Sequence, residues 1–206
     1  MTHSSLSRFV RPAAAIALTL GASVAFAHPG HPGHTAGSSL LAGFLHPLTG
    51  ADHLLAMVAV GVWSALAARA VRDALWAPVA FVALMVTGAL LGAGGMALPM
   101  VEPMIAASLL VFGLLIATRT AMPRWAGALL CGGFALFHGY AHGTEFPAGA
   151  QAMFPSFVAG FAAATALLHA AGIGAGLALK PRLAWLARLS GVGVALYGAG
   201  LLAAAV

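Results

Sequence analysis

Two stretches of this chain combine histidines with a carboxylate inside otherwise apolar sequence. Imidazole nitrogens suit nickel, copper, zinc and cobalt, and a nearby carboxylate offsets the charge of a bound ion. An ionised carboxylate inside a membrane helix costs at least ~2.5 kcal/mol, so it requires a partner or a metal. We therefore predict one metal site made by both stretches. The residues are His46, Asp52 and His53 in the first stretch, and His138, His142 and Glu145 in the second.

The spacing within the second stretch places its three side chains on one helical face. His142 follows His138 by four residues, and Glu145 follows His142 by three. In the first stretch Pro47 predicts a bend, which would fold the leading histidine back toward the carboxylate and the second histidine. Neither stretch completes a cage by itself, so we expect two helices to face each other at the same depth.

Five further residues could contribute to metal handling or to packing. His169 stands alone in an apolar run, where it is either a deeper station for the ion or the donor of a hydrogen bond to the backbone. His28, His31 and His34 repeat in a proline-rich tail, which either captures metal or is only a polar extension. Cys131 sits in apolar sequence and is expected to be a small buried residue.

The composition predicts that this metal chemistry takes place in a membrane. Of the 206 residues, 62% are hydrophobic and only 6% are charged, whereas a soluble domain carries roughly a quarter charged residues. The apolar runs are about twenty residues long and do not alternate, which favours helices over a barrel. The net charge is +5, but the basic residues are scattered at predicted helix ends, so we expect lipid and not nucleic acid as a partner.

The chain is expected to divide into a signal peptide over residues 1–27, a periplasmic histidine-rich tail over 28–39 and a six-helix transmembrane domain over 40–206. A basic start, a short apolar run and the small residues of Ala-Phe-Ala before His28 predict cleavage there. The first helix is predicted to break near Pro47 and Gly50. The expected spans are 40–68, 75–98, 103–121, 125–145, 152–179 and 183–205.

The positive charges predict the orientation of these spans. Every Lys and Arg that follows the predicted cleavage site lies after the first, third or fifth span. Cytoplasmic loops are enriched in Lys and Arg, so we expect a multi-pass protein of the bacterial inner membrane with a periplasmic mature N-terminus. Both histidine stretches then fall near the external side. The charges are Arg69 and Arg72, then Arg119 and Arg124, then Lys180, Arg182 and Arg188.

The two stretches resemble the HupE/UreJ family of membrane proteins. Residues 46–53 match the pattern H-P-x-x-G-x-D-H, and residues 137–145 match F-H-G-x-A-H-G-x-E. The resemblance implies a nickel permease that supplies hydrogenase or urease assembly and is not an enzyme. It also implies that the histidines and carboxylates of both stretches take part in metal transport.

The function expected from the residues and the resemblance is secondary transport of a divalent metal. The chain has no Walker motif, so we expect no ATP and no permanently bound cofactor. Ni²⁺ is the expected cargo, and Co²⁺, Cu²⁺ or Zn²⁺ would suit the same ligands. Two alternatives stay open: an intramembrane metal-dependent hydrolase, and an accessory or sensor protein that binds metal without conducting it. The oligomeric state is left open.

Overall fold

The computed structural model of this chain describes residues 36–147, 149–179 and 183–205, and these ranges contain helices and loops but no strand. The prediction of an all-helical protein is therefore confirmed. The α-helices are α2 (Ala36–Thr49), α3 (Ala51–Ala67), α4 (Trp76–Ala93), α5 (Val101–Thr118), α6 (Arg124–Glu145), α7 (Phe154–Leu179) and α8 (Ala184–Ala204). Two short 3₁₀ helices, η2 (Val71–Leu75) and η3 (Gln151–Met153), precede α4 and α7.

The first predicted elements lie outside the described residues. This applies to the signal peptide over residues 1–27 and to the histidines of the tail. The end of the predicted tail differs from the expectation, because residues 36–39 already belong to α2. The repeated prolines stop at Pro32, and the small residues that follow can enter a helix.

Several of these helices have the length and composition of membrane spans. Among the described residues, η2 with α4, α5, η3 with α7, and α8 form four such segments, and the pair α2–α3 makes a fifth if it is one span. The chain is thus a multi-pass membrane protein. α6 occupies the predicted span 125–145 but does not reach the same apolarity, because it carries histidines, glycines and Glu145. The count of six spans stays a prediction that depends on α6.

The first predicted span is broken where the sequence indicated. α2 and α3 meet at an angle of 82°, and the residue between them, Gly50, has an extended backbone. Pro47 lies buried in the last turn of α2 and cannot donate a backbone hydrogen bond to the preceding turn. The carbonyl of Gly50 accepts the first hydrogen bond of α3, from the N–H of Leu54 at 3.0 Å. The prediction of a break near Pro47 and Gly50 is confirmed.

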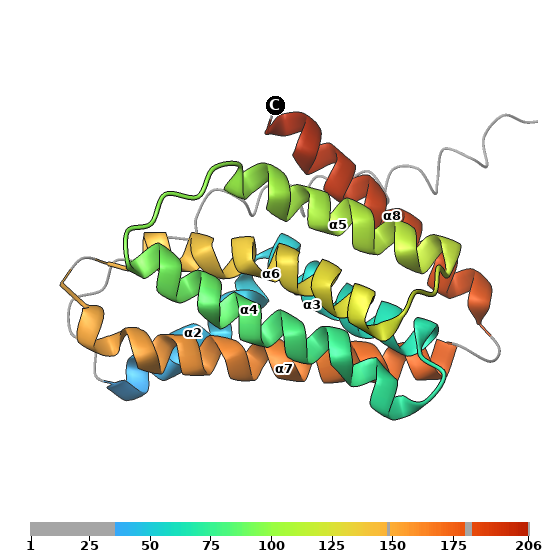
Figure 1. The fold of residues 1–206 in the computed structure, drawn as a ribbon, viewed down its shortest axis with the longest axis horizontal. Helices are drawn as coiled ribbons and strands as arrows, with labels where there is room; N and C mark the ends of the chain where they lie inside the picture. The colour runs from blue at the N-terminus through green and yellow to red at the C-terminus, as the bar shows by residue number, and fades with distance from the viewer. Residues whose placement is uncertain (1–35, 148, 180–182, 206) are drawn as a thin grey trace, which may run out of the picture.

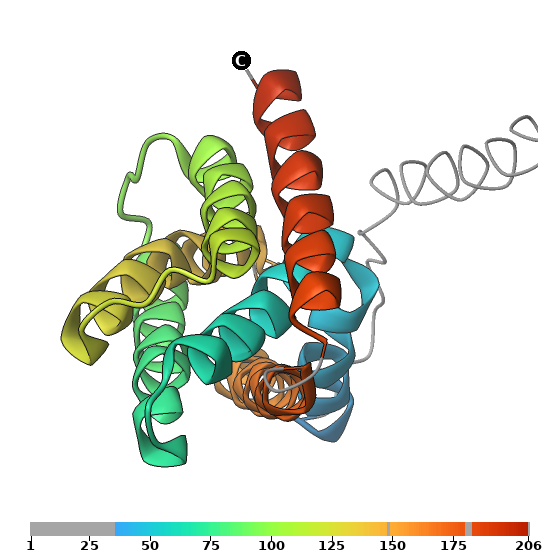
Figure 2. The same ribbon diagram turned by 90° about the vertical axis from the view of Figure 1, so that its right-hand side faces the viewer.

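The helices pack around α3, which touches α2, α4, α5, α7 and α8. Two views of the bundle place α5 and α8 on one side and α2 and α7 on the other, with α3 and α6 between them (Figures 1 and 2). The most extensive contacts join α4 to α6, α5 to α8, and α7 to both α2 and α3. Most side chains from Ala56 to Leu66 of α3 are buried, so this helix forms the centre of the core.

Glycines bring the paired helices into backbone contact. At Gly139 of α6 a β-carbon would overlap the carbonyl of Met85, and at Gly88 of α4 it would overlap the carbonyl of Leu136. Small residues at such crossings let helices approach closely in lipid, where no hydrophobic force drives them together. This contact fixes the rotation of α6 about its own axis. It therefore decides which α6 side chains point into the bundle.

A pair of alanine substitutions on α6 tests this close contact. We expect Gly139→Ala to lower the free energy of unfolding by about 1–3 kcal/mol, because the added methyl group must push α4 away. Gly133→Ala is the matched control, since a β-carbon at Gly133 meets nothing within 4 Å. The measurement is thermal or denaturant unfolding of purified protein in detergent. Equal stability of the two variants would contradict the described α4–α6 contact.

Candidate metal centre

Four of the predicted histidines lie together in the structure. The Nε2 atom of His46 is 3.1 Å from the Nδ1 atom of His142. The ring centroid of His53 lies 4.6 Å from that of His142 and 5.0 Å from that of His138. We call these four residues the histidine cluster. They come from three different helices, which is the arrangement expected from the two sequence stretches.

The break at Gly50 and the helical spacing on α6 together assemble the cluster. Because α2 and α3 diverge by 82°, His46 and His53 reach the same ring, His142, from opposite sides of the break. His138 lies one turn before His142 on the buried face of α6. His138 and His142 are only 0% and 7% exposed, so the cluster is closed off from solvent on the α6 side.

Hydrogen bonds to Asp52 set the orientation of His53 and the tautomer of its neutral ring. One carboxylate oxygen, Oδ1, accepts hydrogen bonds from the backbone N–H of His53 at 2.8 Å and from its Nδ1 at 2.9 Å. A β-carbon at Gly50 would lie 2.9 Å from this oxygen, so glycine makes room for the carboxylate. With the proton on Nδ1, the lone pair of neutral His53 is on Nε2. This carboxylate–histidine pair is the form in which metal-binding histidines are commonly oriented.

Ser108 of α5 orients His138 in the same way, through a hydrogen bond to one ring nitrogen. The Ser108 hydroxyl donates to the carbonyl of Ile105 at 2.6 Å. The hydroxyl has a single proton, so it must accept the hydrogen bond that joins it to Nε2 of His138 at 2.9 Å. The ring therefore carries its proton on Nε2 and its lone pair on Nδ1. Ser108 could not be identified from the sequence, since a lone serine in an apolar helix gives no signal of its partner.

The second nitrogens of three cluster rings have no hydrogen bond among the described residues. They are Nε2 of His53, Nδ1 of His138 and Nε2 of His142, and all three are buried. Buried polar atoms are seldom left without a partner, and the first two carry lone pairs that a metal ion could use. The rings meet edge to face or at a tilt. In the described part of the chain, no three His, Cys, Asp or Glu side chains converge on one point as a metal cage.

Two other predicted ligands lie apart from the cluster. Glu145 is the last residue of α6, is exposed, and forms no hydrogen bond or ion pair with any described residue. His169 of α7 is buried against the ring of Phe81, at 4.9 Å between centroids. His28 lies outside the described residues, so its role stays a prediction. Cys131 is buried and free, as expected.

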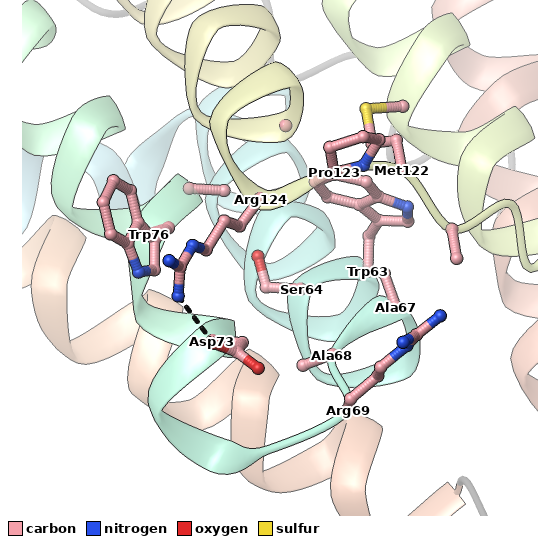
Figure 3. Close-up of a pocket in the computed structure, with 13 residues that line it drawn as sticks. Trp63, Ser64, Ala67, Ala68, Arg69, Asp73, Trp76, Met122, Pro123 and Arg124 are labelled. Carbon is pink, nitrogen blue, oxygen red and sulfur yellow. Dashed lines mark hydrogen bonds and ion pairs between the residues drawn. The ribbon is translucent and has the colours of Figure 1, made fainter.

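A pocket with several polar side chains in its lining is found at the opposite end of α3 and α6 from the histidine cluster. It has a volume of about 500 Å³, and its lining includes Trp63, Ser64 and Arg69. The guanidinium of Arg124 lies 3.4 Å from Oδ1 of Asp73 and 4.9 Å from the ring centre of Trp76 (Figure 3). The bundle thus has a polar region at each end, with the apolar core around α3 between them.

Comparisons with known proteins show which family has sequences similar to this chain. The sequence profile described as HupE / UreJ protein matches residues 16–201. The Protein HupE of Rhizobium leguminosarum bv. viciae is 46% identical over 199 residues, which cover 95% of this chain and 97% of that protein. No solved structure matches the chain. The resemblance seen in the two sequence stretches is therefore confirmed.

The hydrogen-bond pattern predicts opposite tautomers for two neighbouring histidines. In ¹⁵N NMR of histidine-labelled protein without metal, we expect the proton on Nδ1 of His53 and on Nε2 of His138. Ser108→Ala should remove the preference at His138 and cost about 1–3 kcal/mol of stability, because a buried N–H loses its acceptor. Ser64→Ala is the control, since the buried Ser64 hydroxyl has no partner among the described residues. The same tautomer at both rings would refute this assignment.

Proposed function

This chain belongs to the HupE/UreJ family, whose members are permeases and accessory membrane proteins and not enzymes, and we propose that it is a permease for a divalent transition metal. Nickel is the proposed cargo. The chain has no cofactor of its own, and the metal it delivers supplies hydrogenase or urease maturation. The family membership supports a role in metal uptake linked to these enzymes.

The observation that carries the proposal is the histidine cluster. Four imidazoles from three helices touch one another inside a membrane protein, and two of them are held by hydrogen bonds in tautomers that aim a free lone pair away from the partner. Neutral imidazole binds nickel, cobalt, copper and zinc but is a poor ligand for magnesium or calcium.

Asp52 gives the cluster the negative charge that a cation in lipid requires. A divalent ion loses its hydration shell on leaving water, and an uncompensated charge in the bilayer is very costly. Among the described residues, Asp52 is the carboxylate bonded to a cluster histidine, and its side chain is 31% exposed. It can therefore attract an incoming ion and stabilise it while the histidines replace water.

The two polar ends of the bundle suggest a direction of travel. We propose that the cluster faces the periplasm, as the Lys and Arg distribution indicates. The pocket beside Asp73 and Arg124 then opens at the cytoplasmic side of the inner membrane. α3 begins beside the cluster and its last turn lines the pocket. An ion that follows this helix would move from the outer cluster to the inner pocket.

Transport assays on liposomes containing the purified protein test the proposal. We expect saturable ⁶³Ni²⁺ uptake, and at least about a tenfold loss in Asp52→Asn, which keeps the hydrogen-bond acceptor but removes the charge. Glu145→Gln should mainly raise the KM, because this exposed carboxylate lies outside the cluster and can only concentrate ions near it. Glu102→Gln, another exposed carboxylate at the start of a helix, is the control.

Three results would overturn the proposed function. Normal uptake by Asp52→Asn would show that the aspartate only shapes the protein. Metal binding without any flux in the wild type would favour an accessory or sensor protein. Hydrolysis of a lipid or peptide bond is the third outcome, and it would contradict the family assignment as well.

The chemistry of imidazole also predicts how uptake depends on pH. A protonated ring has no lone pair for a metal, so protons and metal ions compete for the same nitrogens. We expect uptake to fall as the pH is lowered, because protonation of the cluster histidines removes the lone pairs that bind the ion. The assay changes the pH equally inside and outside the liposomes, so that no proton gradient contributes. Uptake that is constant or greater in acid would exclude neutral histidines as the essential ligands.

A further inference from the structure

Beneath the histidine cluster, two methionine sulfurs and a hydroxyl group meet in the core. The Oγ1 atom of Thr165 on α7 lies 3.4 Å from Sδ of Met57 on α3 and 3.6 Å from Sδ of Met85 on α4. All three side chains are at most 1% exposed. The same hydroxyl is 2.8 Å from the carbonyl of Phe161, one turn earlier on α7.

These contacts gather unused electron pairs at one point. The hydroxyl has one proton, and the carbonyl of Phe161 is its strongest acceptor, because thioether sulfur accepts hydrogen bonds only weakly. The oxygen lone pairs of Thr165 and both sulfurs are then left without a donor between them. Electron-rich atoms of three helices therefore meet at the Thr165 hydroxyl, and this group suits a cation better than another apolar side chain would.

His169 lies near these atoms with one ring nitrogen left for an ion. It follows Thr165 by one helical turn on the same face of α7. Both ring nitrogens are buried, and the backbone carbonyl of Met57 lies where one ring N–H can donate to it, which leaves the other nitrogen without a partner among the described residues. A buried imidazole in this state is costly to leave unsatisfied. Its place one turn from Thr165 makes the remaining nitrogen a candidate ligand for the same ion.

One aromatic ring separates this group from the histidine cluster. The ring of Phe81 on α4 lies 5.7 Å from that of His138 in the cluster and 4.9 Å from that of His169, between centroids. On α7, Phe161 packs 4.6 Å from His142 and Thr165 follows one turn later. α7 thus runs from the cluster to the lower group without interruption.

We propose that Met57, Met85, Thr165 and His169 form a second, sulfur-containing ion station, which receives the metal from the histidine cluster past the ring of Phe81. This proposal rests on the proposed permease function and adds a specificity element to it. Thioether and imidazole donors favour late transition metals, whereas magnesium, calcium and manganese prefer oxygen ligands. The station therefore rejects abundant hard cations that pass the outer carboxylate.

Nickel K-edge X-ray absorption of the nickel-loaded protein tests the station directly. We expect sulfur scatterers in the wild type and their loss in the double variant Met57→Leu/Met85→Leu. Leucine replaces methionine with little change in volume, so the fold should tolerate it. The control variant, Met104→Leu, changes a methionine that is partly buried against the same core and should keep the sulfur signal.

Liposome uptake provides the second measurement. The double variant should lower ⁶³Ni²⁺ uptake by at least about tenfold and lower the ratio of nickel to manganese uptake, while the control retains both. Thr165→Val, which removes the hydroxyl, should also reduce uptake, and Thr165→Ser should restore it. These threonine variants decide the question if the methionine variant fails to fold.

The outcomes separate this proposal from the permease function. If nickel is transported with only nitrogen and oxygen ligands, and the methionine and threonine variants match their controls, the second station is wrong and the permease function stands. If the wild type neither binds nor transports nickel, the permease function itself fails. Sulfur ligation that survives in Met57→Leu/Met85→Leu would place the ion at other methionines and overturn the assignment.

Discussion

The 82° bend between α2 and α3 is the constraint on which the metal centre depends. A straight helix through residues 46–53 would direct its side chains along one line, whereas the bend lets His46 and His53 meet the same ring of His142. Broken helices are tolerated at membrane depth only where neighbouring protein covers the freed backbone groups. Here α7 packs against both α2 and α3, and the close contacts at Gly43 and Gly61 hold it there.

The cluster is organised by bonds that occupy one nitrogen of a ring and leave the other free. Asp52 accepts a hydrogen bond from Nδ1–H of His53. Ser108 donates its own proton to a backbone carbonyl and accepts a hydrogen bond from Nε2–H of His138. Orientation is thereby fixed before any ion arrives, which reduces the entropy lost on binding. The cost is a set of buried nitrogens without partners. A stable protein tolerates such atoms most readily where they serve a ligand.

The sequence predicted the helical class, the break at Pro47 and Gly50, and the four histidines that meet, because each leaves a local pattern. Helical spacing places His138 and His142 on one face, and proline removes a hydrogen bond wherever it stands. The partners of these residues could not be predicted in this way. Ser108, Phe81 and Met85 reach the site only through the packing of α4 and α5, which depends on glycine contacts between distant segments. Sequence reasoning likewise treated Glu145 as equal to Asp52, although only tertiary structure distinguishes an exposed helix end from a carboxylate bonded to a ring.

The proposed route carries little negative charge, and this property suits transport. Asp52 can offset only half the charge of a divalent ion, and the deeper group of Met57, Met85, Thr165 and His169 contains no carboxylate. Neutral nitrogen and sulfur atoms select for the metal, but they do not fully offset its positive charge. Conduction requires binding that is favourable enough for the ion to enter and weak enough for it to leave. A second carboxylate in the core would bind the ion too tightly for release. The neutral donors below Asp52 therefore allow one bundle both to select the metal and to release it.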